Sequence, residues 1–217
     1  GQREVLTVQR LLFQSDFYQY RLSSAERRQV LILMMLTGDG FSTSSALTDQ
    51  LYISKATLIK DMESVECYFA QRGVGFDPAR NAGYRLEIDE LTRRELLLEN
   101  MTDIVMRHCF LSGSVNGMTS GTLYGFVMQT FGGLEQMGAF QEAVRQVERD
   151  TGIRLNDGEY QNIIHGLAVL LSRLRRRAAL PAQWDCGPVR GTAVRFADGL
   201  CRSLGPRLGL EFPWPEQ

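Results

Sequence analysis

The sequence predicts a mainly α-helical protein with two domains, and three observations lead to this expectation. Apolar residues recur at spacings of three and four over several long segments, which is the period of an amphipathic helix. Only one stretch, at about residues 74–88, has the composition of two short strands joined by a turn. The chain has 217 residues, 44% hydrophobic and 23% charged, which suits one large or two modest domains.

The first domain is expected at residues 21–88, and we interpret residues 1–20 as the end of a preceding segment. This domain opens with "SAERRQVLILMML", a run so apolar that it predicts a helix buried on most sides. The stretch "SSALTDQL" follows and carries a shorter apolar pattern, which predicts a second, short helix.

A third helix is predicted from "YISKATLIKDMESVECYF". Ser54 can cap this helix by accepting from backbone N–H groups of its first turn. Its apolar set recurs at spacings of three and four and shares one face: Leu58, Met62, Val65 and Phe69. The other face is expected to carry a polar set: Lys55, Thr57, Lys60 and Asp61.

Two short strands are predicted next, around Val74–Phe76 and Tyr84–Ile88, with a turn rich in Pro, Asn and Gly between them. Three helices followed by a hairpin is the order of a winged helix-turn-helix, in which the third helix reads DNA and the hairpin forms the wing. The expected DNA-binding residues lie at the start of that helix and at the wing tip: Ser54, Lys55, Thr57, Lys60, Arg80 and Asn81.

Charge limits what this domain can bind by itself. Acidic residues outnumber basic ones from Phe41 to Glu90, so sequence-independent attraction to phosphates should be weak. The net charge of −1 argues against a general nucleic-acid coat or an anionic-membrane binder. A lysine pair on a solvated helix face in a protein-interaction module would give the same pattern, and both interpretations stay open.

Several other classes of protein have no support in the sequence. The longest apolar run, Val30–Leu36, is too short to span a bilayer and no signal segment opens the chain, so we expect a cytoplasmic protein without membrane insertion. The four cysteines form no CxxC pair and only two histidines are present, so we expect reduced thiols, no metal site and no cofactor. We find no phosphate-cradling glycine motif, nucleophile elbow or paired carboxylates, so we expect no enzymatic activity.

Residues 89–217 are expected to form an all-helical second domain. It begins with a long helix, "DELTRRELLLENMTDIVMRHCFL", and a Gly- and Ser-rich stretch at 112–121 follows. The helical pattern returns from Ala139, with apolar residues on one face: Phe140, Val144 and Val147. Gly152 is placed to end that helix as a C′ glycine.

An internal echo links "GIRLNDGEY" at Gly152–Tyr160 with "GLEFPWPEQ" at Gly209–Gln217. Each copy has a glycine stop, a short apolar alternation and then an acidic residue at a helix start, where a carboxylate suits the helix dipole. In the first copy a helix follows, "YQNIIHGLAVLLSRLRRR". We therefore expect a further helix of this domain after Gln217.

Two stretches, in this order, resemble the bacterial PTS-regulation-domain (PRD) transcription regulators of the BglG and MtlR/LicR kind, with their Mga-like helix-turn-helix. The stretch "LTDQLYISKATLIKDMESVECYFAQRGVGFDPARNAGYRLE" looks like the winged helix of that family. The stretch "DTGIRLNDGEYQNIIHGLAVLLSRL" looks like its PRD. The resemblance covers most of the chain and implies a winged helix-turn-helix followed by an all-helical PRD bundle.

The resemblance also implies a function. Such proteins bind operator DNA of sugar uptake and utilisation operons, work as homodimers, and are phosphorylated on PRD histidines by HPr or a sugar-specific enzyme IIB. His165 would be the phosphorylation site, with Arg173 and Arg176 as neighbours of the phosphate charge. The family interval from histidine to helix arginine is usually seven residues, and here it is eight. We expect the face of His165 to be accessible.

Two alternatives within the family stay open. One is an RNA-binding antiterminator, which shares the PRD but begins with a small β-rich RNA-binding domain; the winged helix favours DNA. The other is a PRD that serves as a dimerisation module without phosphorylation, in which His165 is an ordinary polar-face residue. The arginines after it also suit a helix C-terminus with no phosphate present.

Overall fold

The structure, a computed structural model, describes residues 22–79, 83–112, 133–178, 180 and 191–210. Among these residues it is mainly helical, with seven helices and one two-stranded sheet, which confirms the predicted mainly α class. The chain divides into two compact units, residues 1–127 and 128–217. We describe each unit by itself.

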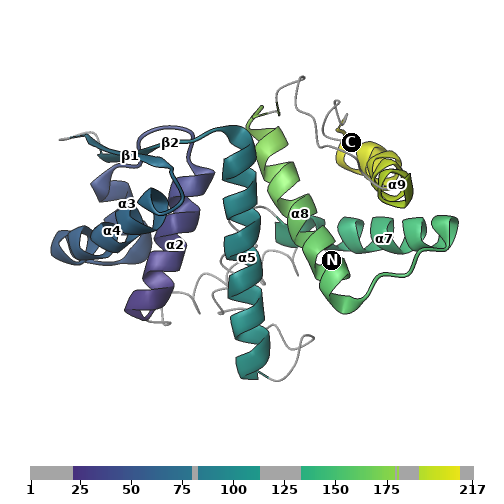
Figure 1. The fold of residues 1–217 in the computed structure, drawn as a ribbon, viewed down its shortest axis with the longest axis horizontal. Helices are drawn as coiled ribbons and strands as arrows, with labels where there is room; N and C mark the ends of the chain where they lie inside the picture. The colour runs from purple at the N-terminus through teal and green to yellow at the C-terminus, as the bar shows by residue number, and fades with distance from the viewer. Residues whose placement is uncertain (1–21, 80–82, 113–132, 179, 181–190, 211–217) are drawn as a thin grey trace, which may run out of the picture. The chain divides into compact units, whose positions relative to one another are not determined.

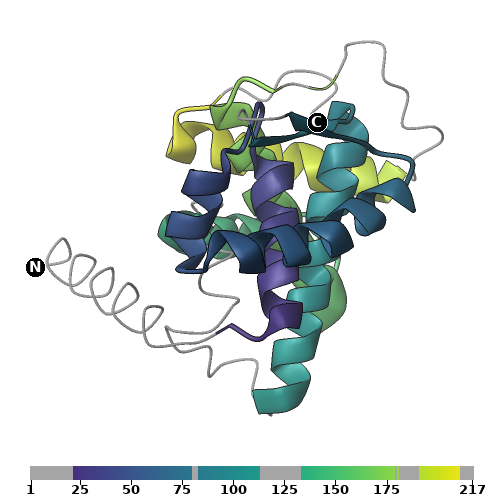
Figure 2. The same cartoon turned by 90° about the vertical axis from the view of Figure 1, so that its left-hand side faces the viewer.

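The first unit contains four helices and one hairpin among its described residues (Figure 1). In chain order the elements are α2 (Ser24–Thr37), α3 (Ser44–Leu51), α4 (Lys55–Ala70), β1 (Gly75–Ala79), β2 (Gly83–Glu87) and α5 (Glu90–Ser112). Helix α2 contacts α4, α5 and β2, and α4 also contacts α3 and β1. In Figure 2, α4 crosses in front of α2. Helix α2 is thus the centre of this unit.

Helix α2 is buried over most of its length, as its apolar run predicts. It begins with a capping box, because Glu26 N–H donates to Ser23 Oγ (3.3 Å) and Ser23 N–H donates to Glu26 Oε2 (2.8 Å). From Val30 to Thr37 every residue except Met34 is buried. Burying each large aliphatic side chain contributes about 1.5–3 kcal/mol to folding, so this run is the main source of the unit's core.

A buried arginine of α5 completes the C-terminus of α2. Arg93 Nη1 donates to the carbonyl oxygens of Leu36 and Gly38, at 2.7 Å each, where helix carbonyls have no partner inside the helix. Further along α5, Asp103 accepts from Gln29 Nε2 at 2.7 Å. Helix α5 therefore packs in the first unit, whereas the second domain was expected to begin at residue 89.

The turn from α3 to α4 is tight and polar. The Thr43 hydroxyl caps α3 by accepting from Ala46 N–H (3.2 Å). Tyr52 ends α3 in the left-handed conformation, with φ 53° and ψ 45°, a region that costs a residue with a side chain about 1–2 kcal/mol. Ser54 then caps α4. Two residues separate the end of one helix from the cap of the next.

The hairpin pairs β1 and β2 antiparallel, in the register from Gly75↔Glu87 to Ala79↔Gly83. A bridge from the loop before α3 extends it, because Ser42 and Tyr84 exchange backbone hydrogen bonds of 2.8 and 3.0 Å. Gly83 makes this approach possible: its φ is +104°, and a Cβ there would lie 2.1 Å from the Ser42 carbonyl oxygen. Only glycine fits at this position.

An aromatic row joins the hairpin to α4. The rings of Phe69 and Phe76 stack at 6.3 Å between centroids, and the ring of Tyr84 lies 5.7 Å from that of Phe76. Two strands were predicted here, and two are present, but β1 continues to Ala79, through residues that were expected in the turn. Pro78 is tolerated because the strand lies at an edge of a two-stranded sheet.

The second unit contains three helices among its described residues: α7 (Gly133–Thr151), α8 (Asp157–Arg175) and α9 (Gly191–Leu208). Helix α7 contacts both α8 and α9. The predicted apolar face of α7 is buried at Phe140, Val144 and Val147. Gly199 of α9 lets the helices approach closely, since a Cβ there would lie 3.0 Å from Val147 Cγ2.

The internal echo corresponds to equivalent backbone geometry. Gly152 follows α7 with φ +70°, and Gly209 follows α9 with φ +63°, so both are left-handed residues just after a helix, as predicted for Gly152. After the first glycine, Asn156 and Glu159 form a capping box that opens α8. The corresponding part of the second copy, residues 211–217, lies outside the described residues.

Candidate nucleic-acid interface

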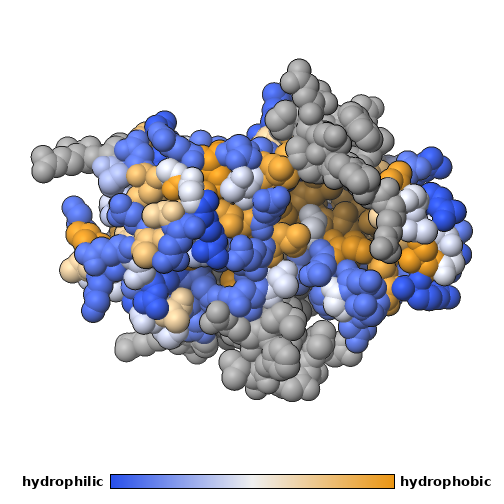
Figure 3. Space-filling model, viewed as in Figure 1, coloured by the Kyte–Doolittle hydropathy of each residue, from blue (hydrophilic) through white to orange (hydrophobic). Residues whose placement is uncertain are grey.

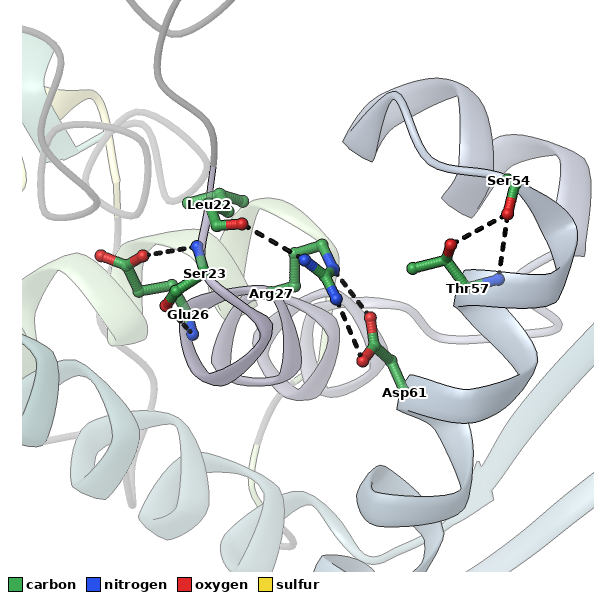
Figure 4. A network of polar contacts seen from close by, with 7 residues as sticks. All are labelled: Leu22, Ser23, Glu26, Arg27, Ser54, Thr57 and Asp61. Atoms are coloured by element: carbon green, nitrogen blue, oxygen red, sulfur yellow. Dashed lines mark hydrogen bonds and ion pairs between the residues drawn. The ribbon is translucent and has the colours of Figure 1, made fainter.

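The start of α4 is held by two hydroxyl groups that bond to each other. Thr57 N–H donates to Ser54 Oγ (3.1 Å), and the two side-chain oxygens lie 2.9 Å apart (Figure 4). Ser54 is therefore the N-cap that the sequence predicts. Both hydroxyls have a structural role, and Ser54 remains exposed at the helix tip.

Lys55 and Lys60 are both exposed, in agreement with the predicted polar face. Neither lysine forms an ion pair with another of the described residues. Their ammonium groups are therefore available to an anion such as a phosphate. This is the electrostatic requirement for a helix that lies along a nucleic-acid backbone.

The buried face of α4 holds the four predicted apolar residues and one that was predicted on the other face. Leu58, Met62, Val65 and Phe69 are all buried. Asp61 was expected beside the lysines, and this expectation is wrong: its side chain is only 5% exposed. It accepts from Arg27 Nε at 2.7 Å and from Arg27 Nη2 at 3.3 Å (Figure 4). A paired guanidinium compensates the buried charge.

Arg27 was not among the predicted site residues, although it fixes α4 to α2. Its Nη1 also donates to the Leu22 carbonyl oxygen at 3.2 Å. The sequence held a signal for this pair, because Asp61 is three residues after Leu58 and four before Val65, so it falls on the apolar stripe. A carboxylate at that spacing needs a buried cation. The pair therefore sets how the tip of α4 is presented.

The other end of α4 is bonded to α5. Asn100 Nδ2 donates to the Tyr68 hydroxyl at 2.7 Å, and Arg72 Nη2 donates to Glu99 Oε1 at 2.8 Å. The Arg72 guanidinium also lies over the Tyr68 ring, 3.8 Å from its centroid. Burial raises the pKa of Tyr68, and the hydrogen bond to Glu99 raises the pKa of Arg72. Helix α4 is thus bonded to α2 through Asp61 and to α5 at its C-terminal end.

The wing candidates Arg80 and Asn81 lie outside the described residues. Nearby, Arg85 of β2 is engaged within the unit: its Nη2 donates to Asp77 Oδ2 at 3.4 Å, and its guanidinium lies 5.0 Å from the centre of the Phe41 ring. The Arg85 guanidinium of the hairpin is therefore held by internal contacts, whereas Lys55 and Lys60 of α4 form no ion pair with another described residue.

His165 is placed differently from the expectation. It was expected on an accessible face of its helix, but the side chain is buried, with 1% of its surface exposed. Ala168 and Ser172, which lie near His165 on the helix surface, are buried as well, because α8 is covered over a wider arc than its apolar stripe. Burial lowers the pKa of His165 from 6.5 to about 4, so the imidazole is neutral at pH 7.

The two arginines expected near a phosphate differ in their surroundings. Arg173 is 2% exposed, whereas Arg176 is exposed at the C-cap of α8. A cation at a helix C-terminus interacts favourably with the helix dipole. Arg175 ends this helix, Arg176 and Arg177 follow it, and all three are exposed. His108 lies in the part of α5 whose side chains are not described.

The surface that is visible in Figure 3 is mixed in character. Hydrophilic residues are spread over the face of the first unit in this view, with smaller hydrophobic areas between them. Among the described residues, no helix combines the length and apolar character that crossing a bilayer requires. Nor do the described residues contain a group of three or more His, Cys, Asp or Glu side chains that is arranged to hold a metal ion.

No family model matches this chain, and no curated protein matches it significantly.

Proposed function

We propose that the first unit is a winged helix-turn-helix that binds operator DNA through α4, and that the chain is a transcription regulator of the PRD type. The observation that carries this proposal is the exposed start of α4. It presents Lys55 and Lys60, neither of which pairs with a charged group in the part of the chain that the structure describes, on a helix fixed by Arg27. The order α2, α3, α4, β1, β2 supports the same conclusion.

The turn before α4 adds support. Helix-turn-helix motifs join their two helices by a short turn that often contains glycine, the residue that adopts positive φ without strain. Here Tyr52 takes that conformation with φ 53°, and the Ser54 cap follows directly. The bridge from Ser42 to Tyr84 gives the hairpin a third pairing segment, which holds a wing against the helices.

The proposed mechanism divides the work between phosphates and bases. The two lysines neutralise phosphates, but acidic residues outnumber basic ones from Phe41 to Glu90, so electrostatic affinity is modest. Binding must therefore depend on contacts between the exposed face of α4 and base edges in the major groove. Such a module selects sequence more than it coats DNA.

We propose that the second unit regulates the first in the manner of a PRD, in an operon for sugar uptake or use. Phosphorylation of His165 by HPr or enzyme IIB would require the histidine to leave its buried position first. The burial of His165 therefore favours the alternative in which this unit serves as a dimerisation module without phosphorylation. Phosphotransfer from HPr to wild type and to His165→Gln discriminates the two. Equal labelling would place any switch elsewhere.

DNA binding is tested with the full chain and a pool of random duplexes. After selection, the salt dependence of binding is compared for wild type, Lys55→Ala/Lys60→Ala and a matched control, Arg154→Ala/Arg195→Ala, which removes two exposed cations of the second unit. We expect the lysine variant to bind at least about tenfold more weakly, with a salt slope reduced by about 2. The control should match wild type.

Two results would contradict the proposal. An unchanged affinity and salt slope in the lysine variant would remove α4 from the interface. Selection of single-stranded or hairpin RNA in preference to duplex DNA, from a mixed pool, would favour the antiterminator alternative.

A further inference from the structure

The exposed arc of α4 contains one large apolar side chain. Ile59 is 49% exposed, whereas the other large aliphatic residues of this helix, Leu58, Met62 and Val65, are at most 3% exposed. Isoleucine gives no local advantage at such a position, because its helix propensity is lower than that of alanine, lysine or glutamate. The residue is therefore not explained by the stability of α4.

The neighbours of Ile59 on the helix surface are charged or small. At about 100° per residue, Ile59 lies about 40° round the helix from Lys55 and about 100° from Lys60. Ala56 and Glu63 occupy the arc between the lysines, and both are exposed. An apolar side chain thus lies between two cations, with the carboxylate of Glu63 and the methyl-sized Ala56 beside it on the same arc.

This arrangement distinguishes between two kinds of partner. An apolar protein surface needs a contiguous hydrophobic patch of some hundreds of Å², and the exposed arc of α4 offers a single large apolar group. The major groove of DNA has the opposite character: phosphates line both edges, and the apolar group that base pairs display within it is the thymine 5-methyl. The lysines complement the edges, and Ile59 complements the methyl.

We propose that Ile59 is a specificity-determining residue that contacts the 5-methyl group of a thymine in the major groove. The inference rests on the proposed DNA binding and deepens it, since it names the base that the exposed face of α4 selects. Ala56 is small enough to let the helix approach that base. Any thymine contacted in this way lies between the phosphates bound by Lys55 and Lys60.

The test removes the methyl group from the DNA and the apolar side chain from the protein, separately and together. Each thymine of a duplex selected by the full wild-type chain is replaced singly by deoxyuridine, which pairs identically but lacks the methyl. At one position we expect about fourfold weaker binding by wild type, because the complex loses the burial of one methyl group. For Ile59→Ala the same replacement should have no effect.

The matched control is Val194→Ala, which truncates another half-exposed aliphatic residue, in the second unit. It should keep the wild-type response to deoxyuridine. If Ile59→Ala binds too weakly to measure, Ile59→Val provides the comparison, and its response should lie between that of wild type and no response.

The outcomes separate this inference from the proposed function. If wild type selects no duplex, DNA binding itself fails, and the assignment of Ile59 fails with it. If wild type binds DNA but no thymine responds to loss of its methyl, or the response persists undiminished in Ile59→Ala, the role of Ile59 is overturned and DNA binding stands.

Discussion

The ion pair between Arg27 and Asp61 leads to an asymmetric prediction for stability. Changing Arg27→Met keeps the side-chain stem but leaves a carboxylate whose side chain is 5% exposed. A buried charge that has lost its partner costs about 3–5 kcal/mol. Changing Asp61→Leu leaves a guanidinium that is 17% exposed and still donates to the Leu22 oxygen. We therefore expect this change to lower the free energy of unfolding by only about 1–3 kcal/mol.

The double variant Arg27→Met/Asp61→Leu should be more stable than Arg27→Met alone, because it removes both charges from the interface of α2 and α4. The exposed pair Arg149–Glu142, with side chains 53% and 47% exposed, supplies the control. Arg149→Met should cost less than about 1 kcal/mol.

The assay must report on the first unit alone, because two units need not unfold together. Native-state hydrogen exchange of peptides from α2 and α4, measured against urea, gives the free energy of opening for these helices. A cost below about 1 kcal/mol for Arg27→Met would refute the reasoning. So would a larger cost for Asp61→Leu than for Arg27→Met, or a double variant whose loss equals the sum of the singles.

Two further predictions concern the hairpin and α8. Gly83→Ala should cost more than about 2 kcal/mol, because its Cβ would meet the Ser42 carbonyl at 2.1 Å; Gly73→Ala, with φ +69° but open space, should cost only about 1 kcal/mol. Equal melting temperatures for these two variants would contradict this. Burial lowers the pKa of His165 to about 4, so the unfolded chain binds its proton more readily, and stability should fall by about 3 kcal/mol as the pH drops from above 6.5 to about 4. His165→Gln should lack this loss, and urea midpoints that stay parallel for the two proteins over this range would argue against it.

Local periodicity predicted the elements that depend on local sequence. The spacing of Leu58, Met62, Val65 and Phe69 gave the buried face of α4, and Ser54 gave its start. The left-handed glycine after α7 was recognisable from its place at the end of a periodic run. These features depend on a single turn or a single helix face, so the chain within about ten residues determines them.

Features that depend on distant partners were not predictable in the same way. Arg27 and Asp61 are 34 positions apart, and Arg93 bonds to carbonyls more than 50 positions earlier. The spacing of Asp61 places it on the apolar stripe of α4, but nothing local identifies Arg27 as its partner or distinguishes Arg93 from a solvated charge. His165 was misplaced for a related reason, because the pattern of α8 gives its most apolar stripe and not how many sides are covered.

The arginine that completes α2 affects how such proteins can be recombined. A chimaera that joins the first unit to a different effector at residue 88 would omit Arg93, Asn100 and Asp103, and with them the bonds from α5 to the Leu36 and Gly38 carbonyls, Tyr68 and Gln29. The transplanted unit would carry a central helix that lacks the Arg93 donor at its C-terminus and is exposed on the side that α5 covers. A junction after Ser112 keeps α5 with its partners, so exchange of the second unit should preserve the stability of the first only when α5 stays with it.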